Sequence, residues 1–66
     1  MKNKIKELRK SKEYRQEDLA AALDVSRQTI IAIENNNYNP TLELAMKLAR
    51  YLDTTVEELF ILEEPK

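Results

Sequence analysis

The sequence contains no cysteine, no histidine, no glycine and no tryptophan. Without cysteine and histidine, the chain cannot form disulfides, zinc fingers or the usual pairs of nucleophile and base. Without glycine, it cannot build a glycine-rich phosphate loop, so phosphoryl transfer is unsupported. An enzyme would have to work from carboxylates, lysines and tyrosines alone, and no constellation of these suggests a nucleophile with its base or a set of metal ligands. We therefore expect no enzyme, no metal site, no cofactor and no small-molecule ligand.

Long apolar runs are absent too. The longest falls far short of the roughly 20 residues that a membrane span requires, and the N-terminus lacks the apolar core of a signal peptide. We therefore expect a soluble, cytoplasmic protein that does not enter a membrane. Residues 1–66 are enough for one domain, and we expect no second domain that senses a ligand. The core should be modest, because a chain of this size buries only ~60% of its unfolded surface.

Charge is unevenly divided along the chain. The net charge is −1, but residues 1–33 hold eight basic and five acidic residues, whereas residues 34–66 hold three basic and seven acidic ones. A basic half can face phosphate groups while an acidic half points away from them. The alternative is that both halves are ordinary solvated surface. The asymmetry says more about partners than the net charge does.

Two short helical patterns occupy residues 16–34, QEDLAAALDVSRQTIIAIE. In the first, Leu19 and Leu23 lie four residues apart on one face, and polar and acidic residues fill the first turn. In the second, Ser26 can accept hydrogen bonds from the backbone N–H groups that follow it, and Ile30 and Ile33 recur at helical spacing. Both helices are too short to stand alone, so the rest of the chain should hold the pair in place.

Only Asp24 and Val25 separate these two helices. Such a short connection makes them cross at a steep angle, with Val25 tucked between them and Ala20 small enough to let the backbones approach closely. The unit is a helix-turn-helix. Because the chain has no glycine, other residues must fill its left-handed backbone positions, and Asp and Asn tolerate them best. We expect Asp24 in the turn, and the asparagines at 35–37 after the second helix, to take this role.

At these residues the sequence resembles a known family, the phage-repressor type of helix-turn-helix regulators named for the lambda, 434 and Cro repressors. The resemblance is carried by QEDLA at 16–20, VSRQTI at 25–30, IEN at 33–35 and YNP at 38–40, followed by Leu42, Leu44 and Ala45. It extends over residues 5–60 and is strongest to the small stand-alone members. It implies an all-α, compact, five-helix domain like that of the lambda repressor.

The resemblance also implies a function. We expect a homodimeric transcriptional regulator, more specifically a repressor, that reads a (pseudo)palindromic operator in double-stranded DNA through the major groove. An alternative of a different class is a protein-interaction module, such as an antitoxin that neutralises a partner through its apolar tail and binds DNA only secondarily. The acidic second half of the chain motivates that alternative.

Helical spacing predicts three more helices around this pair. Residues 2–12 place Ile5 and Leu8 on one face of a first amphipathic helix. Thr41 can cap a fourth helix over residues 42–52, with Leu44 at the edge of its packed face. The residues expected to form that packed face are Leu42, Ala45, Leu48, Ala49 and Leu52. A short fifth helix should follow Thr55, with Val56, Leu59 and Phe60 on its face.

The beginnings of the second and fifth helices differ in their capping residues. Arg15 stands where the family commonly has a serine that caps the second helix, and Asp18 should partly compensate by favouring the helix N-terminus. Thr55 and Glu58 fit a capping box, in which each side chain satisfies a backbone donor of the other.

The resemblance assigns DNA contacts by position. Side chains at the N-terminal end of the second helix of the pair lie closest to the bases, where arginine can bind guanine and glutamine can bind adenine. The residues expected to read bases are Ser26, Arg27, Gln28, Thr29, Ile31 and Ala32. Those expected to contact phosphates are Gln16, Asn35, Asn37, Tyr38 and Asn39. The alternative is that Arg27 and Gln28 belong to an ordinary exposed helix and that Ile31 extends the packed face.

Two further assignments follow from the resemblance. Arg9 and Glu34 match a partly buried ion pair that ties the first helix to the end of the third, a structural role. The run of three bulky apolar residues at 60–62 exceeds what one helix face can bury, so residues 60–66 are expected to form a dimerisation segment. The interface residues are Tyr51, Phe60, Ile61 and Leu62. The tail could also pair as a short antiparallel strand with residues near Lys2, or Ile61 and Leu62 could fold back onto the monomer core.

Overall fold

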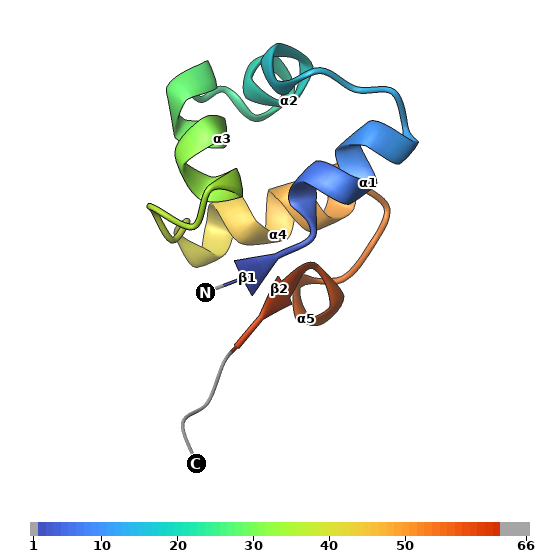
Figure 1. Ribbon diagram of the computed structural model, residues 1–66, viewed down its shortest axis with the longest axis vertical. Coiled ribbons are helices and arrows are strands. Elements are labelled where there is room, and N and C mark those ends of the chain that lie inside the picture. The colour runs from blue at the N-terminus through green and yellow to red at the C-terminus, as the bar shows by residue number, and fades with distance from the viewer. Residues whose placement is uncertain (1, 63–66) are drawn as a thin grey trace.

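The computed structural model of the chain describes residues 2–62, which form five helices and one two-stranded sheet (Figure 1). The all-α, five-helix prediction is confirmed. In chain order the elements are β1 (Lys2–Asn3), α1 (Ile5–Ser11), α2 (Gln16–Leu23), α3 (Arg27–Glu34), α4 (Leu42–Tyr51), α5 (Val56–Leu59) and β2 (Phe60–Ile61). Within residues 2–62, no helix has the length and apolar character needed to cross a bilayer.

The first helix is shorter than predicted. It begins at Ile5 rather than near Lys2, because Lys2 and Asn3 form β1 and pair antiparallel with β2, in the register Lys2 to Ile61 and Asn3 to Phe60. The short pairing between the tail and the residues near Lys2 is therefore confirmed. The same pairing corrects the prediction that Phe60 lies on the face of the fifth helix, since α5 ends at Leu59 and Phe60 opens β2.

Three helices begin with a hydroxyl cap, as predicted. The side-chain oxygens of Ser26, Thr41 and Thr55 each accept a hydrogen bond from the backbone N–H three residues later. The Glu58 carboxylate accepts from the Thr55 hydroxyl rather than from the Thr55 backbone N–H, so this capping box differs from the expected one. These caps satisfy N–H groups that have no partner within the helix.

The cap of α2 uses a different group. An arginine side chain has no acceptor, so Arg15 cannot cap as a serine does. Instead the Asp18 carboxylate reaches back and accepts a hydrogen bond of 2.7 Å from the Arg15 backbone N–H. The expected compensation by Asp18 is thus present as a direct contact with the backbone at the beginning of α2.

Within residues 2–62, four residues with a side chain occupy the left-handed region that glycine usually fills. They are Glu13, Asp24, Asn36 and Asp53, with φ between 57° and 63°, and they follow the ends of α1, α2, α3 and α4. Asp24 and Asn36 were expected from the sequence. Glu13 was not, and it is the one residue of the four without a short Asn or Asp side chain.

The core lies between the helix-turn-helix pair and the helices that surround it. Its fully buried side chains come from every helix: Ile5, Leu19, Ile30, Ile33, Leu48, Leu52 and Leu59. Tyr14 and Tyr51 close one side of this core, with ring centroids 4.9 Å apart. In the view of Figure 1, α4 crosses below α3 and packs under the helix pair.

The prediction for the packed face of α4 was wrong at one residue. Ala45, Leu48, Ala49 and Leu52 are buried, but Leu42 is 70% exposed, and Leu44 packs partly against the core in its place. Leu42 and Leu44 flank the buried stripe on opposite sides of the helix. Only the Leu44 side has neighbours to cover it.

Candidate nucleic-acid interface

The turn between α2 and α3 is fixed by backbone hydrogen bonds and by Val25. The Val25 N–H donates to the Ala20 carbonyl at 3.0 Å, and Asp24 takes the left-handed conformation that ends α2. Val25 is half-buried against the core, and Ala20 is buried. This arrangement holds α3 at a steep angle to α2 and leaves its first turn at the surface.

The first turn of α3 carries two exposed polar side chains after its cap. Ser26 accepts a hydrogen bond of 3.1 Å from the Thr29 N–H, and the hydroxyl oxygens of Ser26 and Thr29 lie 2.9 Å apart. Arg27 and Gln28 are exposed, and within residues 2–62 their side chains have no hydrogen bond or ion pair. Both side chains are therefore available to a ligand in front of this helix end.

The two sides of α3 differ in burial. Ile30 and Ile33 are almost completely buried in the core, whereas Ile31 and Ala32 are only half-buried. Ile31 and Ala32 thus keep apolar surface on a side of the helix other than the packed one. Such surface can contact the methyl group of thymine.

The loop after α3 is exposed over most of its length. Asn37 anchors it, because its N–H donates to the Ala32 carbonyl at 2.9 Å, and the left-handed Asn36 reverses the chain. The side chains predicted to contact phosphates, Asn35, Asn37, Tyr38 and Asn39, are all exposed. These side chains are neutral hydrogen-bonding groups.

Gln16, the other predicted phosphate contact, has a partner within the domain. Its Nε2 donates to Glu34 Oε1 at 3.2 Å. Glu34 also accepts from Arg9, with Nε to Oε2 at 2.8 Å and Nη2 to Oε1 at 3.3 Å, while Arg9 Nη1 donates to the Tyr14 carbonyl. The start of α2, the end of α3 and the first helix are therefore joined at one carboxylate.

One cationic residue near this surface was not among the predicted contacts. Arg15 was treated only as a poor cap, but it lines a shallow surface hollow together with Arg27 and Gln16. Its side chain is largely exposed. The signal in the sequence was its charge, placed directly before the residue expected to touch a phosphate. The sequence also gave no sign of the hydrogen bond by which the Asn3 side chain reaches the end of α3.

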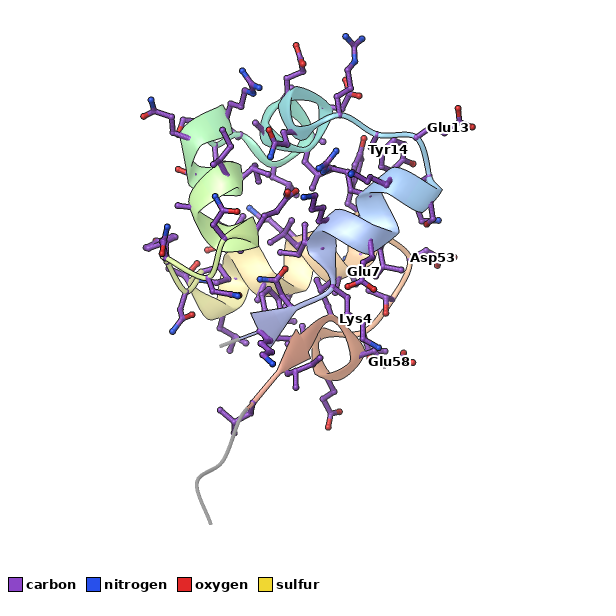
Figure 2. The ribbon with its side chains drawn as sticks, viewed as in Figure 1. Lys4, Glu7, Glu13, Tyr14, Asp53 and Glu58 are labelled. Carbon is purple, nitrogen blue, oxygen red and sulfur yellow. The ribbon has the colours of Figure 1, made fainter. Side chains whose placement is uncertain are left out.

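Three acidic side chains lie on the side of the molecule away from α3. In Figure 2 Glu7, Asp53 and Glu58 lie toward the right of the view, as does Lys4, whereas α3 lies at the left. One of them, Glu7, belongs to the basic half of the chain, and the basic Lys4 lies on the same side, so the separation of charge expected from the two halves stays a prediction. No group of three or more acidic side chains within residues 2–62 is arranged to hold a metal ion.

The described part of the predicted dimerisation segment exposes apolar surface. Phe60 is half-buried against the core, but Ile61 is 39% and Leu62 is 69% exposed. Neither Ile61 nor Leu62 is therefore buried in the monomer core, the alternative left open by the sequence. The ring of Tyr51 packs on Tyr14. Residues 63–66 of the segment lie outside the described residues.

Comparisons with known proteins agree with this geometry. The family model described as Helix-turn-helix matches residues 5–59. The chain is 52% identical over 64 residues to an uncharacterized HTH-type transcriptional regulator of Methanocaldococcus jannaschii, and 47% identical over 64 residues to one of Bacillus subtilis; each match covers 97% of both chains. It is 33% identical over 57 residues to the cryptic phage CTXphi transcriptional repressor RstR of Vibrio cholerae, covering 86% of this chain and 51% of that repressor.

The match covers most of the chain, including the turn, the exposed first turn of α3 and the loop after it. The relatives that align over nearly their whole length are HTH-type transcriptional regulators. The chain therefore belongs to the Helix-turn-helix family of DNA-binding transcriptional regulators.

Proposed function

We propose that the protein is a homodimeric transcriptional repressor that binds a (pseudo)palindromic operator in double-stranded DNA in the cytoplasm. Each protomer places α3 in the major groove of one half-site, and the two half-sites lie about one helical turn apart. The observation that carries the proposal is the first turn of α3. There a serine cap presents Arg27 and Gln28, exposed and without partners within residues 2–62.

Base reading in this proposal comes from the side chains of α3. Arg27 donates two hydrogen bonds to a guanine, and Gln28 donates to and accepts from an adenine. Ser26 and Thr29 contact bases at the same helix end, while Ile31 and Ala32 contact thymine methyl groups one turn later. The arginine and glutamine supply most of the discrimination, because a good bidentate pair separates the right base from the wrong one by about 1–3 kcal/mol.

Phosphate contacts in this proposal flank α3 on both sides. Gln16 at the start of α2 binds one phosphate, and Arg15 adds a charge beside it. The exposed loop binds another through Asn35, Asn37, Tyr38 and Asn39. Such contacts fix the register of the protein on the duplex without reading sequence.

The dimer contact in this proposal is made by β2 and the residue after it. Ile61 and Leu62 expose apolar side chains at the end of the domain that carries the small sheet. A second copy of the chain covers them around a two-fold axis, in an isologous contact. A dimer is needed because one domain of this size makes too few base contacts for tight discrimination.

Footprinting of the DNA upstream of the protein's own gene tests the proposal. The expected result is a protected site with two-fold symmetry, whose occupancy depends on protein concentration as a dimer requires. Binding as a lone monomer would contradict it. If the upstream region is unprotected, a genome-wide selection of bound fragments should still recover a two-fold site, and its failure to do so would also contradict the proposal.

The dimer contact is tested with two leucines of equal exposure. Leu62 is 69% and Leu42 is 70% exposed, so a glutamate at either position disturbs the monomer little. Leu62→Glu is expected to weaken self-association at least tenfold in sedimentation equilibrium, because it places two like charges across the two-fold axis. Leu42→Glu is expected to leave association unchanged. Equal weakening by both substitutions would contradict a contact confined to the tail.

The antitoxin-like alternative rests on the same exposed tail. In that case Ile61 and Leu62 contact a different protein, and DNA binding is secondary. An adjacent reading frame that encodes a toxin-like protein would favour this alternative. So would a complex with the product of that frame that Leu62→Glu disrupts while operator binding is retained.

A further inference from the structure

Asn3 joins three parts of the fold through one side chain. Its Oδ1 accepts a hydrogen bond of 3.1 Å from the Ile5 N–H, at the start of α1. Its Nδ2 donates to the Ile33 carbonyl at 2.8 Å and to Asn36 Oδ1 at 3.2 Å. Asn3 itself belongs to β1. One amide therefore links the small sheet to the first turn of α1, the last turn of α3 and the loop after α3.

Two of these bonds go to backbone groups at helix ends, and the third goes to the loop after α3. The Ile5 N–H lies in the first turn of α1, where backbone donors lack helical acceptors. The Ile33 carbonyl lies in the last turn of α3, where it accepts a hydrogen bond of 3.1 Å from the Asn36 N–H, and Asn3 adds a second one from outside the helix. The bond to Asn36 reaches the left-handed residue that reverses the chain after α3.

The backbone of Asn3 lies in register with the strand that carries the proposed dimer contact. Asn3 pairs with Phe60 and Lys2 pairs with Ile61, while the Lys4 N–H donates to the Leu59 carbonyl at 2.8 Å. A hydrogen-bonded path from Ile61 to α3 therefore runs through β1 and the Asn3 amide. Figure 1 shows the same arrangement, with α3 running down toward β1 and β2 beside it.

We propose that Asn3 is a positioning residue that fixes the orientation of α3 relative to the dimer contact, and so sets the half-site separation that the dimer accepts. The inference rests on the proposed function. In a two-fold dimer, the separation of the two α3 helices is determined by the path from the shared interface to each helix. The last hydrogen-bonded link in that path is the Asn3 amide.

The position of the base-reading residues on α3 is sensitive to a change at the Asn3 contact. α3 has eight residues and is about 12 Å long, and Asn3 holds its C-terminal end while Arg27 and Gln28 lie at the other end. A small rotation about the Asn3 contact therefore moves the base-reading end along an arc whose radius is close to the length of the helix. Misplacement of this end costs affinity on the right operator and lowers the cost of a wrong spacing.

The test compares two variants and a control. Asn3→Asp keeps the shape of the side chain and an acceptor for the Ile5 N–H, but loses both donated hydrogen bonds. Asn36→Gly removes only the second acceptor, and glycine tolerates the φ of 63° there. The control is Ser11→Ala, which removes one exposed hydrogen bond of 2.8 Å from a side chain to the Leu8 carbonyl.

The measurement is the affinity of each dimer for its operator and for operators whose half-sites are one base pair closer or farther apart. The wild type is expected to prefer the native spacing by tenfold or more. Asn3→Asp should bind the native spacing about tenfold less tightly, the loss expected for one or two hydrogen bonds. The ratio of its affinity for the native spacing to its affinity for the altered spacings should fall toward one, while its self-association stays within twofold of wild type. Asn36→Gly should give an affinity and an affinity ratio between those of Asn3→Asp and the wild type. Ser11→Ala should match the wild type in both.

A merely structural role would lower affinity for every spacing by the same factor. An Asn3→Asp dimer that keeps the wild-type ratio between spacings therefore overturns the inference and leaves the proposed function standing. A wild type that binds no two-fold site overturns both. If Asn3→Asp does not fold, Asn3→Ser replaces it, because its shorter side chain keeps an acceptor near Ile5 and cannot reach Ile33; the same two outcomes decide.

Discussion

Arg9 and Glu34 are 25 residues apart in the chain and form the most enclosed ion pair of residues 2–62. Arg9 donates two hydrogen bonds to Glu34, at 2.8 and 3.3 Å, and only 10% and 2% of the two side chains remain exposed. Gln16 binds the same carboxylate. The pair thus fixes α1 and the start of α2 against the end of the helix proposed to enter the major groove.

Breaking this pair should strongly destabilise the fold. Arg9→Met leaves the Glu34 carboxylate buried without its cation, and the loss of one partner from such a pair costs about 3–5 kcal/mol in the free energy of unfolding. The double variant Arg9→Met with Glu34→Leu should recover part of that loss, because neither charge is then stranded. Urea unfolding monitored by circular dichroism measures both. A single variant that loses less than about 1 kcal/mol would contradict this account of the pair.

A second ion pair provides the control. Lys47 and Glu43 lie 3.1 Å apart on α4, but 55% and 77% of their side chains are exposed. Solvent and salt screen such a pair, and the side chains lose entropy when they form it. Glu43→Gln is therefore expected to change the free energy of unfolding by less than about 0.5 kcal/mol.

The left-handed residue after α1 offers a gain in stability. Glu13 has φ of 59°, where the Cβ of a non-glycine residue is crowded by its own backbone. Glu13→Gly should stabilise the protein by about 0.5–1 kcal/mol, because relief of this strain outweighs the added entropy of the unfolded chain. Thermal unfolding should show a higher midpoint. Lys12→Gly, at the preceding residue with φ of −96°, relieves no strain and should destabilise by a similar amount.

Local patterns predicted much of this fold because they reflect forces that act within a few residues. The caps at Ser26 and Thr41 could be predicted from a hydroxyl residue directly before an apolar helical pattern. The left-handed Asp24 could be predicted from a two-residue turn in a chain without glycine. Each of these features is present in the structure. The buried positions of α4 beyond its first turn also followed from spacing alone.

Features that depend on distant partners were not predictable in this way. The helical spacing at the N-terminus ran on through Lys2 and Asn3, and only the presence of Phe60 and Ile61 beside them makes these residues a strand. Leu42 and Leu44 were both close to the packed stripe of α4, and their three-dimensional neighbours decide that Leu44 is the one covered. The hydrogen bonds of Asn3 to the end of α3 span 30 or more residues and leave no periodic signal.

The exposed loop after α3 predicts a shallow dependence of DNA binding on salt. The slope of log affinity against log salt follows the number of phosphates that basic side chains neutralise, at about −0.9 for each. The loop offers asparagines and a tyrosine, and Arg27 is proposed to bind a base, so most of the slope should come from Arg15. Arg15→Ala should reduce the magnitude of the slope by about 1 for each protomer, and Asn37→Ala should leave it unchanged. A steep slope that survives Arg15→Ala would contradict this assignment.

The central claim is that the first turn of α3 reads bases. The most direct test measures the affinity of the wild type, Arg27→Ala and Gln28→Ala for the operator and for unrelated DNA, with Arg50→Ala, an exposed arginine on α4, as the control. Each α3 variant is expected to lower the ratio of the affinity for the operator to the affinity for unrelated DNA by about 10-fold to 100-fold, while Arg50→Ala leaves this ratio unchanged. An Arg27→Ala and a Gln28→Ala protein that both keep the wild-type ratio would contradict base reading by this helix.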